Sequence, residues 1–287
     1  MKSRNFDLRA VGVRTANKIA NRVLGIGPDD LLNPEPAQSG LENPARKLRE
    51  IANDIRAQAI SPETGEVDYG KLVESESYAR LKTFARALPY CAKENLGDRP
   101  HQIAFWINLY NALILHGVLH YKVSGSMLRD SGFFRRVAYN VDGMRFSADD
   151  IEHGVLRGNR RHPYLPFTQF AKDDPRELMS IEDPDPRVHF ALVCGARSCP
   201  PISAYDGEQL DPQLDLAAAA FINGIGAQFD PEAKILSLSR IFKWYAGDFG
   251  GTEGALRMVD RYLDSSLDTA GARIRYLPYD WSVNSLA

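Results

Sequence analysis

The chain has few cysteines, no large excess of charge of either sign and no recognisable export signal. Its 287 residues include three cysteines, an odd number without the spacing of a disulfide framework. This argues against a disulfide-stapled secreted fold and favours reduced thiols in a cytoplasmic protein. The formal net charge is −2, whereas nucleic-acid-binding proteins typically carry a strong basic excess. We therefore expect a cytoplasmic protein without a nucleic-acid partner.

The first 25 residues lack the unbroken apolar core of a signal peptide. Their mixture of basic and apolar residues also suits a helix lying on an anionic membrane surface, so peripheral membrane contact through residues 1–25 is the alternative to a mobile or loosely docked arm. Gly25–Gly40 contains three prolines and no apolar periodicity, which is typical of a linker. We expect a basic arm and Pro/Gly linker over residues 1–40 and a single domain over residues 41–287.

One long segment, residues 102–121, contains no Asp, Glu, Lys or Arg and is long enough to cross a membrane. Its polar side chains would be costly in hydrocarbon, however, and both flanks carry mixed charges. Apolar residues on every side of a helix indicate burial in a protein core. The sequence therefore predicts a buried central helix and no transmembrane segment.

Around this helix the apolar spacing predicts further helices at residues 44–59 and 75–88. Asp142-Gly143, between two short apolar runs, predicts a β-hairpin. Further strands are expected at residues 187–194, which would be central, and at 235–238 and 273–277. Since helices outnumber strands and do not alternate with them, we predict an α+β fold: a mainly helical single domain around a buried central helix, with a small, largely antiparallel β-sheet.

Several blocks of sequence carry a more specific signal. They are AFWINLYNALILHGVL (104–119), YNVDGMRFSADDIEHGVLR (139–157), DPRVHFALVCGARSCPP (185–201), IFKWYAGDFG (241–250) and YDWSVN (279–284). In this order they resemble the family catalogued as domain of unknown function 547 (DUF547), over roughly residues 67–284. The resemblance implies a single module and attaches no reaction to it.

The best candidate for chemistry is the loop that ends the expected strand at 187–194. Cys194 is the predicted nucleophile, and its base would be His153, or His189 after a bend, because His189 and Cys194 would face opposite sides of a regular strand. The backbone N–H groups of residues 195–197 could form a nest for an oxyanion. The alternative is a buried free cysteine beside a structural turn.

Other polar residues interrupt apolar segments. Asn108 and Asn111 share a helix face, where they either tie neighbouring backbone to the helix or form a pocket floor. Glu152, His153 and Arg157 follow a predicted helix cap, and an ordinary solvated helix face is the favoured interpretation; in a pocket, Arg157 would anchor a carboxylate or phosphate. We predict that at least four binding candidates line one pocket with the 194–199 loop; the candidates are Asn108, Asn111, Glu152, Arg157, His189, Ser198 and Asp248.

Two histidine patterns could suggest a metal. His116 and His120 are four residues apart on a helix without a further ligand, and His189, Cys194 and Cys199 supply only three ligands at unusual spacings. We therefore predict no metal and no cofactor. The predicted function is a thiol-dependent hydrolase or acyl-transfer enzyme acting through Cys194 with a histidine base. The alternative is a non-catalytic module that binds a small molecule or a protein partner.

Overall fold

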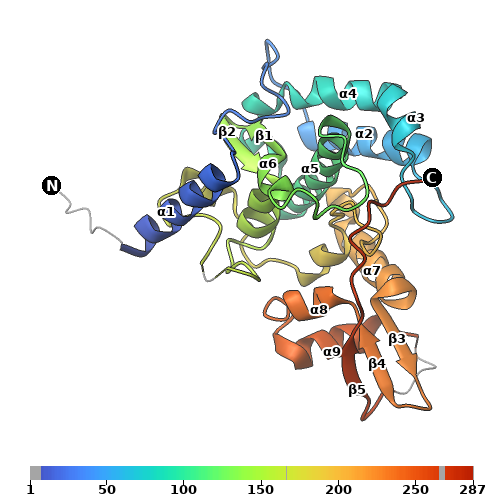
Figure 1. The fold of residues 1–287 in the computed structure, drawn as a ribbon. Coiled ribbons are helices and arrows are strands. Elements are labelled where there is room, and N and C mark those ends of the chain that lie inside the picture. Colours follow the sequence, from blue (N-terminus) through green and yellow to red (C-terminus); the bar gives the residue numbers. More distant parts are fainter. Residues whose placement is uncertain (1–7, 166, 265–268, 287) are drawn as a thin grey trace.

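The computed structural model describes residues 8–165, 167–264 and 269–286. Figure 1 shows a mainly helical upper part and a smaller lower part that holds a sheet. The predicted α+β class is confirmed. In chain order the named elements are α1 (Leu8–Val23), α2 (Pro44–Ala59), α3 (Tyr69–Glu74), α4 (Glu76–Ala85), α5 (Arg99–His120), α6 (Phe133–Arg136), β1 (Ala138–Val141), β2 (Met144–Ser147), α7 (Leu210–Phe221), β3 (Ala227–Asp230), β4 (Ile235–Leu238), α8 (Arg240–Trp244), α9 (Gly251–Tyr262) and β5 (Arg273–Tyr276).

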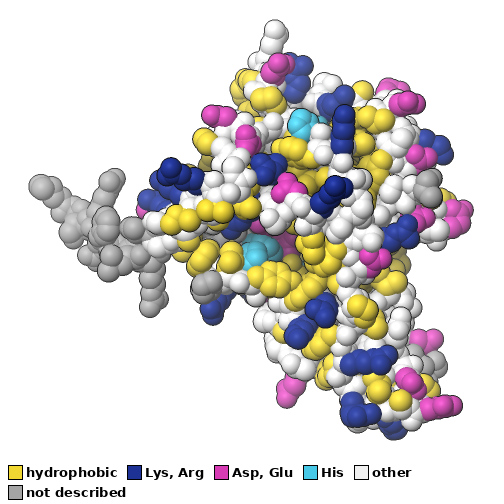
Figure 2. Space-filling model, viewed as in Figure 1, with side chains coloured by type: hydrophobic (Ala, Val, Ile, Leu, Met, Phe, Trp, Pro, Cys, Tyr) yellow, Lys and Arg dark blue, Asp and Glu magenta, His cyan; other side chains and the backbone are white. Residues whose placement is uncertain are grey.

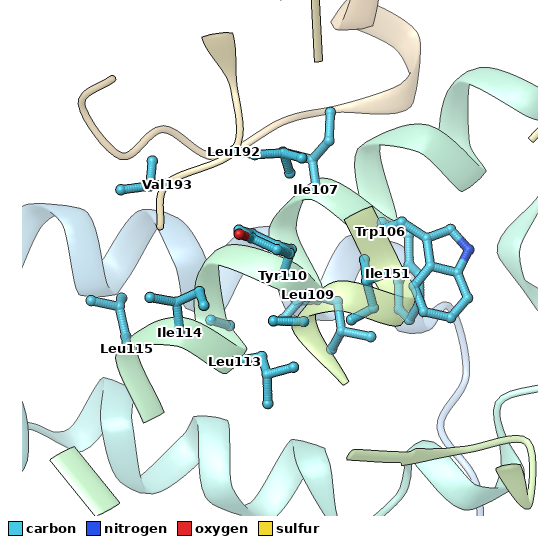
Figure 3. Packing of buried hydrophobic residues seen from close by; sticks show 14 of the residues in the cluster. Trp106, Ile107, Leu109, Tyr110, Leu113, Ile114, Leu115, Ile151, Leu192 and Val193 are labelled. Atoms are coloured by element: carbon cyan, nitrogen blue, oxygen red, sulfur yellow. The ribbon is translucent and has the colours of Figure 1, made fainter. Parts of the chain in front are cut away.

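Helix α5 is the centre of the larger hydrophobic cluster, as predicted (Figure 3). Asp98 caps its first turn by accepting the N–H of His101, and Pro100 occupies the first turn, where no N–H is needed. From Ile103 to Val118 every side chain is buried. Among the described residues α5 alone is long and apolar enough to cross a membrane, and the rest of the protein covers it.

Helix α2 packs on both α4 and α5. Its N-cap Asn43 accepts the N–H of Arg46, and Pro44 begins the helix. Its apolar residues at helical spacing, Leu48, Ile51, Ile55 and Ala59, are buried, as is Pro44. Burying each of the larger side chains contributes about 1.5–3 kcal/mol.

The strands form two small sheets. β1 and β2 form the predicted hairpin, in which Asp142 and Gly143 both have positive φ, as a tight primed turn requires. The second sheet has the order β3-β4-β5; β3 and β4 are antiparallel, whereas β4 and β5 are parallel.

A second hydrophobic cluster surrounds this three-stranded sheet and contains Phe190, Phe221, Phe242 and Phe249. Tyr279 contacts both clusters. Beyond it the C-terminal segment returns to the first cluster, where the N–H of Met127 donates to Trp281 O and that of Val67 to Asn284 O. The C-terminus therefore ties the two clusters together.

The prediction of a strand at residues 187–194 is wrong. Residues Pro186–Phe190 form a 3₁₀ helix, capped by the Asp185 carboxylate on the Arg187 N–H. The N–H groups of Ala191 and Leu192 then bond back to Val188 O. The side chains of this segment have the apolar pattern of a strand. Local hydrogen bonds nevertheless satisfy its backbone N–H and C=O groups, so no sheet partner is needed.

The N-terminal arm contains a docked helix rather than a loose segment. Asn17 of α1 donates to Gln169 O at 2.9 Å, and Arg135 donates to the side-chain oxygens of Asn17 and Asn21. Arg136 donates to the Leu24 carbonyl. Residues 1–7 lie outside the described residues, and the domain limits at 1–40 and 41–287 stay a prediction.

Candidate functional site

A cleft of about 590 Å³ lies where the two hydrophobic clusters meet. Figure 2 shows a histidine and acidic side chains inside a hollow bordered by hydrophobic side chains. Rings of Trp244, Tyr279 and Trp281 pack on one another with centroids 4.7–5.7 Å apart, and Tyr164 packs on Trp244 at 5.9 Å. These four residues form what we call the aromatic wall. The remaining lining includes the polar residues Arg135, Asp149, Glu152, His153, His162, His189 and Arg240.

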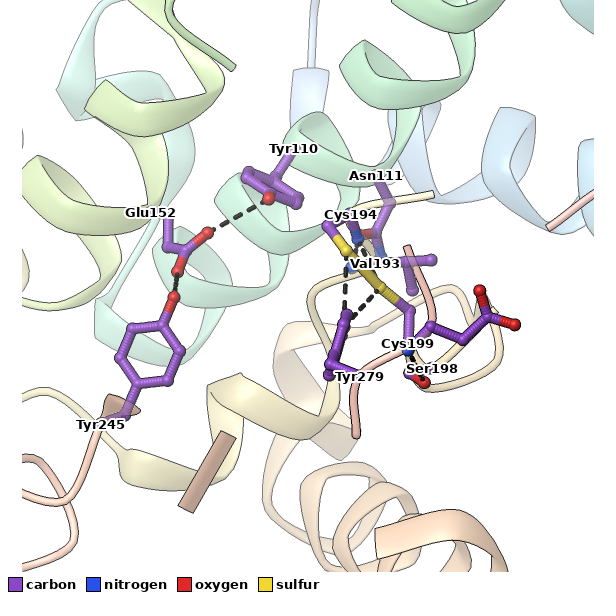
Figure 4. Close-up of a disulfide and its surroundings, with 10 residues drawn as sticks. Tyr110, Asn111, Glu152, Val193, Cys194, Ser198, Cys199, Tyr245 and Tyr279 are labelled. Atoms are coloured by element: carbon purple, nitrogen blue, oxygen red, sulfur yellow. Dashed lines mark hydrogen bonds between the residues drawn. A yellow bond between two sulfur atoms is a disulfide. The ribbon is translucent and has the colours of Figure 1, made fainter. Parts of the chain in front are cut away.

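Glu152 is held by two tyrosines on opposite sides (Figure 4). Tyr110 of α5 donates to Glu152 Oε2 at 3.1 Å, and Tyr245 donates to Oε1. Burial, reinforced by the negative charge of Glu152, raises the pKa of Tyr110 and Tyr245 well above the usual value, so both hydroxyls stay protonated donors. The carboxylate is therefore fixed at the cleft surface.

A π-helix over Asp150–Leu156 explains why Glu152 and His153 both reach the cleft. Its start is the predicted cap, in which Asp150 accepts from Ser147 N and Oγ and Ser147 Oγ accepts the N–H of Asp150. The wider turn, with the N–H of Arg157 bonded to Glu152 O, changes the angle between successive side chains from that of an α-helix. The prediction that this helix presents an ordinary solvated face is wrong, because His153 and Arg157 are buried.

Asp248 joins this helix to the 3₁₀ helix that carries His189. Arg157 donates to Asp248 through Nε at 2.5 Å and Nη2 at 3.1 Å, and His189 Nε2 lies 2.9 Å from Asp248 Oδ2. Burial alone would raise the pKa of Asp248, but hydrogen bonds from His189 and Arg157 hold it well below the usual value. An ionised carboxylate only accepts, so His189 carries its proton on Nε2, and its Nδ1 is unprotonated when the ring is neutral.

Asp149, His153 and His162 form the one group of described residues with metal-ligand geometry, since one ligand atom of each lies within 4.8 Å of the others. Their hydrogen bonds do not fit a metal. His153 Nδ1 faces Arg157 Nη1 at 3.0 Å, and His162 Nδ1 accepts the Tyr164 N–H at 3.1 Å. Both partners are donors, so each neutral ring holds its proton on Nε2 and presents a donor there rather than a ligand.

Burial sets the protonation states of this group. It lowers the pKa of His153 well below the usual value and that of His162 to about 4, so both rings are neutral at pH 7. Burial raises the pKa of Asp149 to about 7, against the opposing effect of Arg135. The group therefore offers hydrogen-bond donors at neutral pH.

Cys194 and Cys199 form a disulfide in the wall of the cleft (Figure 4). The expectation of reduced thiols is thus wrong for this pair, whose Cα atoms are 6.3 Å apart, within the range a disulfide allows. Gly195 permits the turn between them with a φ of 84°. Cys91 is a buried free thiol whose pKa burial raises to about 12.

No histidine is hydrogen-bonded to the Cys194 sulfur among the described residues; its neighbours are Cys199 and the Tyr279 hydroxyl, at 3.5 Å. The C-terminal segment takes one N–H group of the predicted oxyanion nest, that of Arg197, and the N–H of the next residue, Ser198. Arg197 N–H donates to Ser282 O, and Ser198 N–H donates to Asp280 O. The roles of Cys194, His189 and His153 in catalysis therefore stay predictions.

The structure brings together only part of the predicted binding set. Glu152 and His189 line the cleft, while Arg157 and Asp248 line an adjoining hollow that shares His162, Tyr164, Leu165, Trp244 and Tyr245 with it. The expectation that at least four of the seven would share one pocket with the loop is wrong.

The other three have structural contacts. The Asn108 amide bonds to the N–H and C=O of Tyr205, and Asn111 bonds to Ala191 O and Val193 N. Ser198 Oγ accepts the N–H of Asp280. Likewise His116 bonds to Tyr139 OH at 2.8 Å. These polar groups tie distant backbone segments to the core.

Sequence reasoning missed the tyrosines that shape the site. Tyr110, Tyr245 and Tyr279 all lie in blocks that carry the DUF547 resemblance, and their positions in those blocks were the available signal. Aromatic residues in apolar segments usually belong to a core, so spacing alone did not single them out.

Part of the chain matches a known family model. Residues 94–222 match the family model described as a protein of unknown function, DUF547. This range contains α5, the π-helix and the disulfide, so the predicted resemblance is confirmed there, while Tyr245, Asp248 and Tyr279 lie beyond it. No curated protein and no solved structure matches the chain.

Proposed function

We propose that the cleft binds a small organic molecule with an apolar or aromatic body and a hydrogen-bonding polar group. The observation that carries this proposal is the aromatic wall facing the fixed carboxylate of Glu152 within one cleft of about 590 Å³. Sites for small molecules are typically largely apolar with a few fixed polar groups.

The charges of the lining support a ligand with little net charge. Arg135 and Arg240 are opposed by Glu152 and by Asp149, which is partly ionised at pH 7 because burial raises its pKa to about 7. The three histidines add hydrogen-bonding groups. Arg135 is already engaged by Asn17, Asn21 and Asp149. The cleft surface carries charges of both signs. A strongly charged ligand of either sign would therefore be repelled by some of its side chains.

The test is a titration with 8-anilinonaphthalene-1-sulfonate, a probe with an aromatic body and a single charge, followed by fluorescence and calorimetry. We expect saturable binding to one site. Tyr164→Ala removes an exposed ring of the aromatic wall and should weaken binding about fivefold. Tyr90→Ala is the matched control, because Tyr90 is 49% exposed and Tyr164 60%, yet Tyr90 does not line the cleft. Equal affinities of the two variants would reject the proposal.

A second candidate is the thiol-dependent hydrolase or acyl-transfer enzyme. It is favoured by one observation: the Asp248-oriented His189 and the Cys194 sulfur line the same cleft. After reduction of the disulfide, unprotonated Nδ1 of His189 would take the proton of the Cys194 thiol. The resulting thiolate would attack an acyl carbon and expel the leaving group, which takes that proton back from His189 Nδ1. Water would then hydrolyse the thioester.

The measurement for this candidate is release of p-nitrophenol from p-nitrophenyl acetate by the reduced protein. Cys194→Ser should abolish the enzymatic part of the rate, and Cys91→Ser, which removes the buried thiol, should leave it intact. Equal rates for the reduced protein and Cys194→Ser would exclude this candidate.

A further inference from the structure

The Cys194–Cys199 disulfide lies open to the cleft on one side. Cys194 is only partly buried, whereas Cys199 is 6% exposed, and both line the cavity. Thiol–disulfide exchange requires access of a thiolate to one of the two sulfur atoms. Cys194, the more exposed residue of the pair, is therefore the expected point of attack.

The two sulfur atoms differ in their hydrogen-bond donors (Figure 4). Cys199 Sγ accepts the backbone N–H of Cys194 at 3.1 Å and lies 3.2 Å from the Tyr279 hydroxyl, which is 3.5 Å from Cys194 Sγ. Disulfide sulfurs carry no proton, so the hydroxyl is the donor. Burial raises the pKa of Tyr279, which keeps that donor protonated. Both donors would stabilise a thiolate on Cys199.

Contacts other than the disulfide also hold the loop in place. Besides the bonds of Arg197 and Ser198 to the C-terminal segment, the Asn284 N–H donates to Gly195 O, and Ala196 and Val283 form a β-bridge. Tyr279 belongs to the same C-terminal segment. Reduction would therefore leave both thiols next to the hydroxyl that contacts them now.

We propose that Cys194–Cys199 is an exchange site for a low-molecular-weight thiol that enters the cleft. The incoming thiolate bonds to Cys194 Sγ, the S–S bond breaks, and Cys199 leaves as the thiolate. A second thiolate then attacks the small-molecule sulfur of this mixed disulfide and releases the Cys194 thiolate. Two small thiols are oxidised to one small disulfide, the protein disulfide is reduced, and the protons of the small thiols pass to the two cysteines or to water.

This exchange is independent of the ligand binding proposed above and goes beyond it. The test exposes the full-length protein to mixtures of reduced and oxidised 2-mercaptoethanol, quenches with acid, alkylates and maps the peptides by mass spectrometry. We expect the 2-mercaptoethanol adduct on Cys194 with Cys199 alkylated. An adduct mainly on Cys199, or no exchange under conditions that fully reduce the unfolded chain, would overturn the proposal.

The role of the hydroxyl is tested with Tyr279→Phe, which keeps the ring. Loss of one hydrogen bond to the leaving thiolate should slow exchange about fivefold. Tyr276→Phe is the matched control, since Tyr276 does not contact either sulfur. Equal rates in the two variants would remove Tyr279 from the proposal, and circular dichroism melts verify that both fold. The site of the adduct in the unmodified chain tests the exchange itself, whatever the variants do.

Discussion

The Nε2 atom of His189 lies 2.9 Å from Oδ2 of Asp248, and the same carboxylate receives two hydrogen bonds from Arg157. These residues come from a 3₁₀ helix, the segment after α8 and the end of the π-helix, three elements far apart in the sequence. Tyr245 stacks on the His189 ring at 3.9 Å and lies under the Arg157 guanidinium. The Asp248 carboxylate thus holds these three elements together beside the cleft.

Asp248→Asn should destabilise the protein by about 3–5 kcal/mol, because the substitution leaves the Arg157 charge buried without its partner. Urea denaturation at pH 7, followed by circular dichroism, measures the change in free energy of unfolding. Glu253→Gln is the control: it removes a carboxylate that is 92% exposed and 3.9 Å from Arg257, and it should change stability by well under about 1 kcal/mol. A loss for Asp248→Asn no larger than that of the control would show that the buried pair is not stabilising.

Asn111 takes the place of a missing strand neighbour for residues 191–193. Its amide donates to Ala191 O at 3.0 Å and accepts the Val193 N–H at 2.9 Å. Asn111→Ala leaves two buried backbone groups without partners, and each costs about 1–3 kcal/mol. We therefore expect a marked fall in melting temperature and faster amide exchange at Val193.

The control for this prediction is Asn53→Ala, on the exposed face of α2. It should leave both the melting temperature and the exchange of Val193 close to those of the unmodified chain. Slow exchange of the Val193 amide in Asn111→Ala would mean that another group satisfies it, against the structural role assigned here.

The parts of the fold that follow from local pattern were predictable. The buried face of α2 is set by helical spacing, and the β1–β2 turn by Asp142-Gly143. The segment 187–194 was not, because its apolar residues suit a strand while Asp185 and Asn111 supply caps and partners that make a sheet unnecessary. Spacing cannot show that a side chain on α5 will satisfy that backbone.

The candidate site was predictable only in part for a similar reason. His189, His153, Glu152 and Cys194 were recognised as polar groups in apolar segments, and all line the cleft. The π-helical turn that turns Glu152 and His153 to the cleft leaves no trace in apolar periodicity. The contact of Tyr279 with the disulfide joins residues at least 80 positions apart, which no local pattern encodes.

His116 provides a test of how burial couples stability to pH. Burial lowers its pKa to about 4, below the value of about 6.5 expected in the unfolded chain. Between these two pH values the unfolded state binds more protons than the folded state. The contribution of neutral His116 to the free energy of unfolding is therefore fully present above about pH 6.5 and is lost as the pH falls toward 4.

His116→Gln, which can still bond to Tyr139, should reduce the slope of unfolding free energy against pH in this window by at most about 1.4 kcal/mol per pH unit. Urea denaturation between pH 4 and 7 measures the slope, with His120→Gln as the comparison variant, because His120 is an exposed histidine four residues along the same helix. The charge of His120 contributes to the lowered pKa of His116, but less than burial does, so His120→Gln should change the slope less than His116→Gln. His153 and His162 retain their own depressed pKa values in both variants, so some slope should persist. An unchanged slope in His116→Gln would show that this imidazole is not the group that titrates.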